Sequence, residues 1–167
     1  MQKDATTQPR GVECRIPGHL PGGVNADYSI VFTFVNNLVG TIGTDPGAAS
    51  VITGPGSVVA AGTGIGPAQN QYTVNLTGVT NANYVTVGLH QVSDAAGNVG
   101  NEATTMGVLV GDTNADTFVN SADITQTKSQ SGSAVTGSNF REDVNIDGLI
   151  NSADITFVKS KSGTAVP

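Results

Sequence analysis

Residues 112–132 read DTNADTFVNSADITQTKSQSG, and residues 143–163 read DVNIDGLINSADITFVKSKSG. The two stretches align without gaps at a spacing of 31 residues, and 13 of their 21 aligned positions are identical. An internal repeat of this kind indicates one structural unit that occurs twice. We therefore expect the C-terminal third of the chain to consist of two copies of a loop followed by a helix, with the helices at residues 121–131 and 152–162.

Each copy begins with oxygen-bearing side chains at alternate positions. Positions 1, 3, 5, 9 and 12, with the backbone carbonyl of position 7, supply the oxygen ligands that a Ca²⁺ ion takes in a twelve-residue loop. The pattern lacks the sulfur and imidazole groups that zinc and copper favour. We predict two Ca²⁺ ions, with ligands Asp112, Asn114, Asp116, Phe118, Asn120 and Asp123 in the first loop and Asp143, Asn145, Asp147, Leu149, Asn151 and Asp154 in the second.

An alternative interpretation of these loops needs no metal. Asp and Asn also form turns through their own side chains and cap helices. Five matching positions in each of two copies favour the calcium site over this alternative.

At these residues the sequence resembles a dockerin, a domain with two such calcium loops, each followed by a helix. The resemblance covers residues 111–167 and implies calcium-dependent binding of a cohesin domain. It also implies that positions ten and eleven of each loop, with the following helix, contact that partner. The matching residues are Ser121, Ala122, Lys128, Ser152, Ala153 and Lys159. As an alternative, these residues form only an ordinary first helical turn and a solvated helix face.

The first loop departs from the pattern at position six, where the sharp bend favours glycine. The second loop has Gly148 there, whereas the first has Thr117. A β-branched residue at positive φ is strained by about 1 kcal/mol or more. The first site is therefore expected to bind calcium more weakly than the second.

The apolar positions of the repeats predict a small helical pair with a thin core. Phe140, between the repeats, is expected to fill the gap. Residues 111–167 carry seven acidic and four basic side chains, a net charge of −3. A segment with so small a core and so many acidic side chains is expected to need bound metal in order to fold. The predicted core residues are Val119, Ile124, Ile150, Ile155 and Val158.

Residues before the repeats have the pattern of short strands joined by turns. Residues 28–35 alternate between Tyr, Ile or Phe on one face and smaller or polar residues on the other. The segment VSDAAGN at 92–98 resembles a turn of bacterial immunoglobulin-like domains. The chain is thus expected to be mainly β: an immunoglobulin-like antiparallel β-sandwich at 11–110 followed by a small α-helical, dockerin-like domain at 111–167. Strands are predicted at 11–16, 28–35, 38–42, 49–53, 57–61, 71–77, 83–90 and 104–110.

Composition narrows the function. Seven Lys and Arg against thirteen Asp and Glu give a net charge of −6, which argues against nucleic acid and anionic lipid as partners. No apolar run reaches the roughly 20 residues of a membrane span. The single cysteine, Cys14, forms no intrachain disulfide and has no evident catalytic partner. The acidic residues of the N-terminal half lie in apparent turns and tails, so we expect no enzyme.

The N-terminal residues MQKDATTQPR are polar and lack the apolar segment of a signal peptide. We expect an export signal upstream in a longer protein, and a secreted or cell-surface location. Two other functions remain open. The chain could be a structural surface subunit that assembles with neighbouring copies of itself into a filament or wall layer, stiffened by calcium. It could also be a carbohydrate-binding module, although the absence of Trp counts against that.

Overall fold

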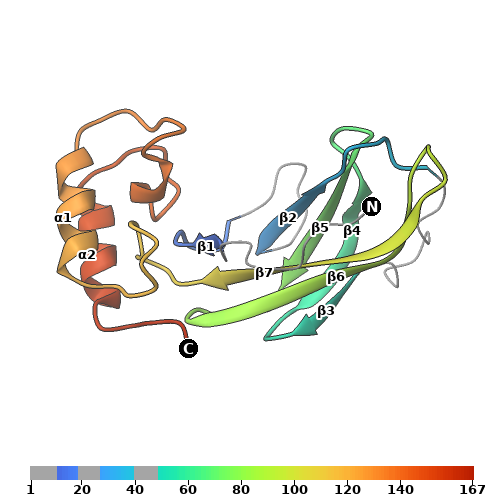
Figure 1. The fold of residues 1–167 in the computed structure, drawn as a ribbon. Coiled ribbons are helices and arrows are strands. Elements are labelled where there is room, and N and C mark those ends of the chain that lie inside the picture. Colours follow the sequence, from blue (N-terminus) through green and yellow to red (C-terminus); the bar gives the residue numbers. More distant parts are fainter. Residues whose placement is uncertain (1–10, 19–26, 40–48) are drawn as a thin grey trace. The chain divides into compact units, whose positions relative to one another are not determined.

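The structure is a computed structural model, and it describes residues 11–18, 27–39 and 49–167. Contacts divide the chain into two compact units (Figure 1). Unit 1 includes Pro17–Val79 and Val85–Thr105, and unit 2 joins Arg10–Ile16, Thr80–Tyr84 and Met106–Pro167. The predicted domain boundary at residues 110 and 111 stays a prediction. The contacts also show that two segments from earlier in the chain pack with the repeats.

The strands form two sheets. One has the order β1-β7-β6-β3 and the other the order β2-β5-β4. The strands are β1 (Gly11–Glu13), β2 (Tyr28–Thr33), β3 (Ala49–Thr53), β4 (Ser57–Ile65), β5 (Gln71–Thr77), β6 (Asn83–Ser93) and β7 (Val99–Val108).

None of the described helices is long and apolar enough to cross a membrane.

Unit 1 obtains its core from the alternation that the sequence predicts. In β2, Tyr28 is buried while its neighbour Ser29 is exposed, and the strand pairs antiparallel with β5. The chain is mainly β, as predicted, and the immunoglobulin-like assignment stays a prediction. The buried apolar side chains of these strands are Tyr28, Ala49, Tyr72, Val74, Leu76, Val85, Val87, Leu89 and Val92.

Several strand bounds differ from those predicted. Strand β4 continues to Ile65, with an irregular register to β5 between Val59 and Gly64. Strand β7 starts earlier than predicted, at Val99, and ends at Val108. In the predicted strand at 38–42, Leu38 forms an isolated bridge with Asp94, and residues 40–42 lie outside the described residues.

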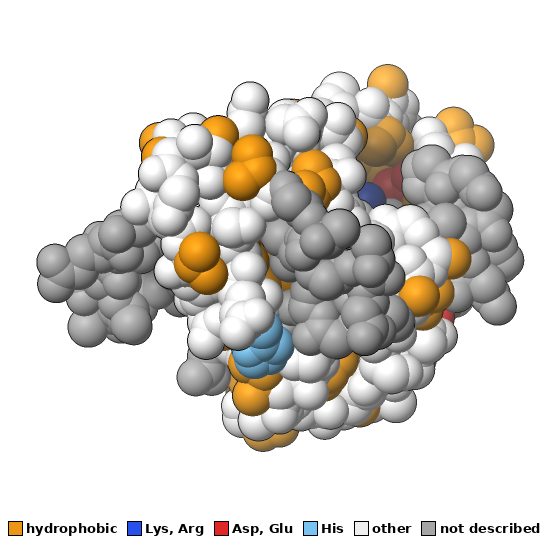
Figure 2. All heavy atoms as spheres, turned by 90° about the vertical axis from the view of Figure 1, so that its right-hand side faces the viewer, with side chains coloured by type: hydrophobic (Ala, Val, Ile, Leu, Met, Phe, Trp, Pro, Cys, Tyr) orange, Lys and Arg blue, Asp and Glu red, His pale blue; other side chains and the backbone are white. Residues whose placement is uncertain are grey.

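The surface of unit 1 carries aliphatic side chains. Figure 2 shows hydrophobic side chains scattered among other side chains and backbone on the face that it presents. Such scattered side chains are ordinary for a protein surface. The exposed large hydrophobic residues that the structure describes in unit 1 are Val31, Val35, Val39, Ile52, Ile65 and Val99.

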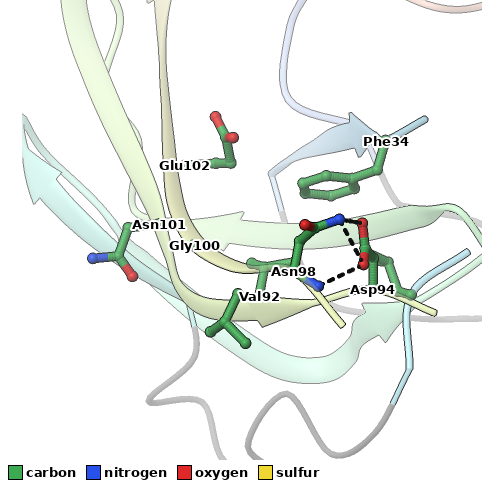
Figure 3. Close-up of a pocket in the computed structure, with 9 residues that line it drawn as sticks. Phe34, Val92, Asp94, Asn98, Gly100, Asn101 and Glu102 are labelled. Carbon is green, nitrogen blue, oxygen red and sulfur yellow. Dashed lines mark hydrogen bonds between the residues drawn. The ribbon is translucent and has the colours of Figure 1, made fainter. Parts of the chain in front are cut away.

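A small pocket lies in unit 1 beside the turn after β6, and Phe34, Asp94 and Glu102 are among its lining residues (Figure 3). The carboxylate of Asp94 is already engaged by this turn. Asn36 Nδ2 donates to it over 2.8 Å, Asn98 Nδ2 over 2.9 Å, and the Asn98 amide over 2.9 Å. These hydrogen bonds hold the pKa of Asp94 at about 2. Asp94 therefore acts as a structural acceptor that joins the two ends of the turn to Asn36.

We predict that Asp94→Asn destabilises unit 1, because an amide removes one acceptor oxygen and turns N–H groups toward Asn36 and Asn98. The folded pKa of about 2 lies below the ordinary aspartate value of 3.8. Ionised Asp94 therefore stabilises the fold above about pH 4, and this contribution is lost as the pH falls through about 2.

Urea unfolding across this pH range measures the effect. The difference in the free energy of unfolding between wild type and Asp94→Asn should be largest near neutral pH and should shrink in acid. Glu102→Gln serves as a matched acid-to-amide control. A difference that does not depend on pH would contradict the structural role of the ionised carboxylate.

Candidate metal centre in the repeated loops

The two repeats fold into helices α1 (Ser121–Gln130) and α2 (Ser152–Lys161), which lie side by side (Figure 1). Each helix begins at an asparagine N-cap and carries an aspartate three residues later. Asn120 accepts a hydrogen bond from the Ala122 amide over 2.7 Å, and Asp123 accepts one from the Asn120 amide over 2.8 Å. This is a capping box, formed by two residues that are also predicted calcium ligands.

The first loop winds around its own carboxylates. Asp112 accepts hydrogen bonds from the Asp116 amide over 3.1 Å and the Thr117 amide over 3.0 Å. Asp116 accepts one from the Phe118 amide over 2.9 Å, and Asp123 accepts one from the Asn114 amide over 3.2 Å. Backbone N–H groups thus fix the acidic side chains before any ion is considered.

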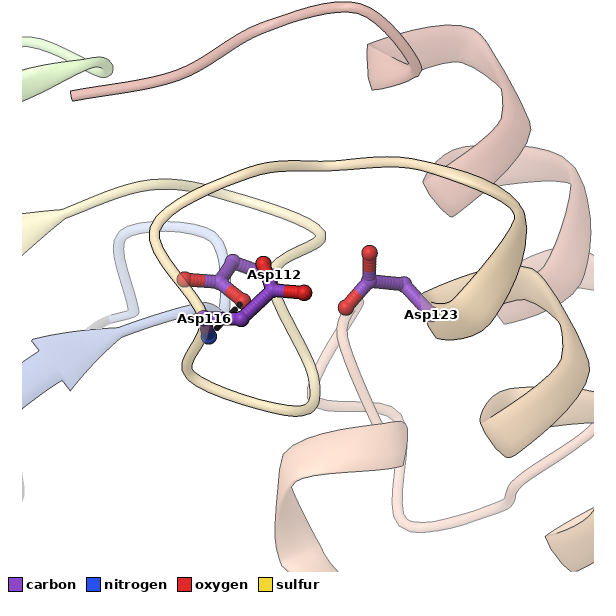
Figure 4. A group of neighbouring side chains, drawn as sticks. All are labelled: Asp112, Asp116 and Asp123. Carbon is purple, nitrogen blue, oxygen red and sulfur yellow. Dashed lines mark hydrogen bonds between the residues drawn. The ribbon is translucent and has the colours of Figure 1, made fainter.

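Three carboxylates of this loop gather in one place (Figure 4). One oxygen from each of Asp112, Asp116 and Asp123 lies within 4.8 Å of the others, and Asp112 and Asp123 are fully buried. Burial raises the pKa of Asp112, and the charges of Asp123 and Asp116 act in the same direction, against hydrogen bonds from backbone amides. Among the described residues, no Lys or Arg forms a salt bridge with this trio.

This donor set fits a hard cation. Buried carboxylates of like charge are costly unless a positive charge compensates them. The loop supplies oxygen donors only, and Ca²⁺ prefers such donors.

The second loop repeats the same hydrogen bonds. Asp143 accepts from the Asp147 and Gly148 amides, each over 3.1 Å. Asp154 accepts from the Asn145 amide over 3.2 Å and the Asn151 amide over 2.9 Å. The described residues contain the close carboxylate trio only in the first loop. The two loops therefore share their backbone arrangement, and they differ in how tightly their acidic groups converge.

Both loops bend at two positions where φ is positive. At position six, Thr117 has φ 75° and Gly148 has φ 84°, which confirms the strained backbone predicted for Thr117. At position four, Ala115 has φ 62° and Ile146 has φ 58°, a feature that we did not predict. The first loop thus holds two non-glycine residues in the left-handed region, and the second holds one. Because Ile146 also lies in the left-handed region, position four adds strain to both loops, and position six is where the two loops differ.

The structure places the other predicted residues as follows. Phe118 and Leu149 are exposed, and their amides donate to Asp116 and Asp147. The predicted partner-contact residues are all exposed, namely Ser121, Ala122, Lys128, Ser152, Ala153 and Lys159.

The core of unit 2 is built mainly from valines. Val119, Ile150 and Val158 are buried as predicted. Phe140 does not fill the gap between the helices, so that prediction is wrong. It lies in a short 3₁₀ helix, η2 (Phe140–Glu142), is 38% exposed, and lies under the Arg15 guanidinium at 5.1 Å. Buried residues from four segments complete the core instead, namely Val12, Leu109, Val110, Val144 and Val166.

Sequence reasoning missed the side chains that hold the start of the first loop. Arg141 donates to the carbonyls of Asp112 and Thr113, and Gln126 donates to Thr113 and to the buried Glu142. None of these contacts has a counterpart in the repeat pattern. Gln126 occupies a position where the second copy has a phenylalanine.

Residues 110–161 match the family model of the dockerin type I domain. This match covers about a third of the chain and supports the resemblance drawn from the repeats. It supports a non-catalytic module for calcium-dependent protein–protein interaction. No curated protein and no solved structure matches the chain.

We predict that the second loop binds calcium about fivefold more tightly than the first, since it holds one strained non-glycine residue against two and each costs about 1 kcal/mol. Thr117→Gly should narrow this gap, and Ile146→Gly should widen it by relieving the second loop instead. The added freedom of glycine in the unfolded chain reduces both effects without changing their opposite directions.

Calcium titration followed by NMR, with the residue 117 and 148 amides as separate reporters, measures both loops in one sample. If both variants shift the ratio of the two affinities in the same direction, backbone strain does not set the ranking.

Proposed function

We propose that this protein is a non-catalytic, calcium-dependent interaction module that binds a cohesin-type domain. In this proposal unit 2 holds one Ca²⁺ ion in each repeated loop and presents the starts of α1 and α2 to the partner. One observation carries the proposal. The two loops share their capping boxes and carboxylate contacts, within the segment that matches the dockerin type I domain.

Calcium supplies the positive charge that the loops lack. The ligands proposed for it are the twelve residues predicted from the sequence, with Phe118 and Leu149 acting through their carbonyl oxygens. Two bound ions change the net charge of residues 111–167 from −3 to +1. Because positions nine and twelve also cap the helices, binding at a loop fixes the start of the helix behind it.

The proposed partner surface occurs twice. Ser121, Ala122 and Lys128 in the first copy match Ser152, Ala153 and Lys159 in the second, and all six are exposed. Small residues at the start of a helix let another chain approach its backbone closely, and a lysine farther along adds a charged contact. The two surfaces are identical in these residues, so either copy offers the partner the same chemistry.

A secreted or cell-surface location accompanies this proposal, since dockerin modules occur in such proteins. A second candidate is assembly with neighbouring copies of the chain. Two outer strands support it, because β3 and β4 lie at sheet edges and expose Ile52 and Ile65. Light scattering of the purified protein with calcium distinguishes a monomer from a growing assembly. Carbohydrate binding is less favoured, because the exposed large hydrophobic side chains described in unit 1 are aliphatic and offer no ring for stacking on a sugar.

Isothermal titration should return two Ca²⁺ ions per chain. Asp123→Ala and Asp154→Ala should each remove one of them, since each deletes a carboxylate that both caps a helix and faces the loop. Glu102→Gln serves as the control and should retain both ions. A wild-type stoichiometry of zero or one would contradict the proposal.

Partner binding should tolerate the loss of one surface. Ser121→Tyr with Ala122→Tyr, or Ser152→Tyr with Ala153→Tyr, should leave the affinity for a cohesin domain within a few-fold of wild type. The quadruple variant should lose binding, as should the wild type in chelator. Surface plasmon resonance measures each case. Loss of binding from one pair alone would show that the two surfaces are not equivalent.

A further inference from the structure

The N-terminal strand belongs to unit 2, far from the repeats in sequence. Strand β1 pairs in parallel with the end of β7, from Gly11↔Met106 to Glu13↔Val108. The Leu109 amide donates to the Glu13 carbonyl over 2.9 Å, and the Gly111 amide donates to the Cys14 carbonyl over 2.8 Å. These bonds reach the residue that immediately precedes the first calcium loop.

Arg141 connects this strand to the first loop. Its Nη2 donates to the Asp112 carbonyl over 2.6 Å, its Nε to the Thr113 carbonyl over 2.8 Å, and its Nη1 to the Val12 carbonyl over 2.8 Å. The planar guanidinium has fixed donor directions, so it holds the three carbonyls in one arrangement. Asp112 is the first proposed ligand, and its backbone is one of the three groups held.

The contacts around Arg141 are reinforced from α1. Gln126 Nε2 donates to the Thr113 carbonyl over 3.2 Å and to Glu142 Oε1 over 2.6 Å. Glu142 is buried and immediately follows Arg141. The Thr113 carbonyl is therefore held from both α1 and η2, and the Asp112 carbonyl is held from η2.

We propose that Arg141 is a positioning residue for the first calcium loop, and that through its bond to Val12 it couples calcium binding at this loop to the docking of β1. This inference rests on the proposed function, because it assumes that the loop binds calcium. Residues that hydrogen-bond to a metal ligand and orient it, without contacting the metal, typically contribute a factor of about 10 to 100 to metal affinity. Coupling of this kind is reciprocal, so calcium at the first loop must also favour docking of the strand.

The only cysteine of the chain reports on that docking. Cys14 follows β1, is fully buried, and its Sγ donates to the Arg141 carbonyl over 3.4 Å. Burial raises the pKa of this thiol to about 12. Only a thiolate reacts readily with a disulfide reagent, so labelling of Cys14 requires the strand to open. The labelling rate therefore measures how often β1 undocks.

The test uses the full chain with Arg141→Lys, Arg141→Gln and the control Lys161→Gln. Lysine keeps the charge but loses the three-way contact, and the control removes a charge of the same module. Calcium titration by NMR, with the Thr117 and Gly148 amides as reporters, measures the calcium affinity of each loop. In both Arg141 variants the affinity of the first loop should fall about tenfold, and that of the second loop should stay within about twofold of wild type. The control should leave both loops within about twofold of wild type. The inference is overturned if the calcium affinity of the first loop is unchanged in Arg141→Lys and Arg141→Gln, or if both loops lose affinity equally.

Labelling of Cys14 supplies the second measurement, and its wild-type arm needs no variant to fold. In the wild type, labelling should slow further as the Thr117 signal shifts with calcium, and in Arg141→Lys this additional slowing should be at least several-fold smaller. If the labelling rate of Cys14 does not change as the first loop binds calcium, the coupling is overturned. If the wild type binds no calcium at all, the proposed function fails. If it binds two ions and only the Arg141 effects are missing, the proposed function stands without this inference.

Discussion

Two fully buried carboxylates in one short loop are the constraint on which unit 2 depends. Asp112 and Asp123 lie within reach of each other and of Asp116, with no Lys or Arg in a salt bridge to them among the described residues. The loop satisfies their oxygens with backbone N–H groups, which orient the charges but do not neutralise them. In the proposed function, a cation offsets the repulsion that remains, and Asp123 both binds the ion and caps α1. In that proposal, ion binding is coupled to formation of the helix start, because both use the Asp123 carboxylate.

Such a module has little apolar surface with which to offset this cost. Its buried side chains are mostly valines, and they come from the repeats, from the end of β7 and from β1. Gathering core residues from distant parts of the chain is one way for a small unit to reach adequate burial. It also makes the unit larger than its repeats, because Val12 contributes to the same core as Val119 and Val158.

The parts of the site that were predictable from sequence are the local ones. Alternating acids, the Asn N-caps and the strained bend at Thr117 depend on residues a few positions apart, and the repeat shows each pattern twice. Contacts made by residues distant in sequence left no such signal. Nothing in Val12 or Cys14 points to the repeats, and Arg141 contacts backbone carbonyls, which every residue carries. Phe140 was misplaced because a large apolar residue between two helices has no sequence feature that distinguishes a buried position from an exposed one under Arg15. The positive φ of Ala115 and Ile146 was missed because neither residue type signals a left-handed turn.

The positions where the two copies differ follow from their unequal surroundings. In the first copy, Gln126 donates to the loop carbonyl of Thr113, and the carbonyl at the matching position of the second copy, Val144, accepts the Ile16 amide over 2.9 Å instead. The backbone of the N-terminal segment thus does for the second loop what side chains do for the first. The second copy is then free to place Phe157 where the first has Gln126, and this phenylalanine packs against the core. The duplicated unit therefore keeps the proposed ion ligands and the helix-capping residues in both copies, while the residues behind each loop differ to suit the neighbour that each copy meets.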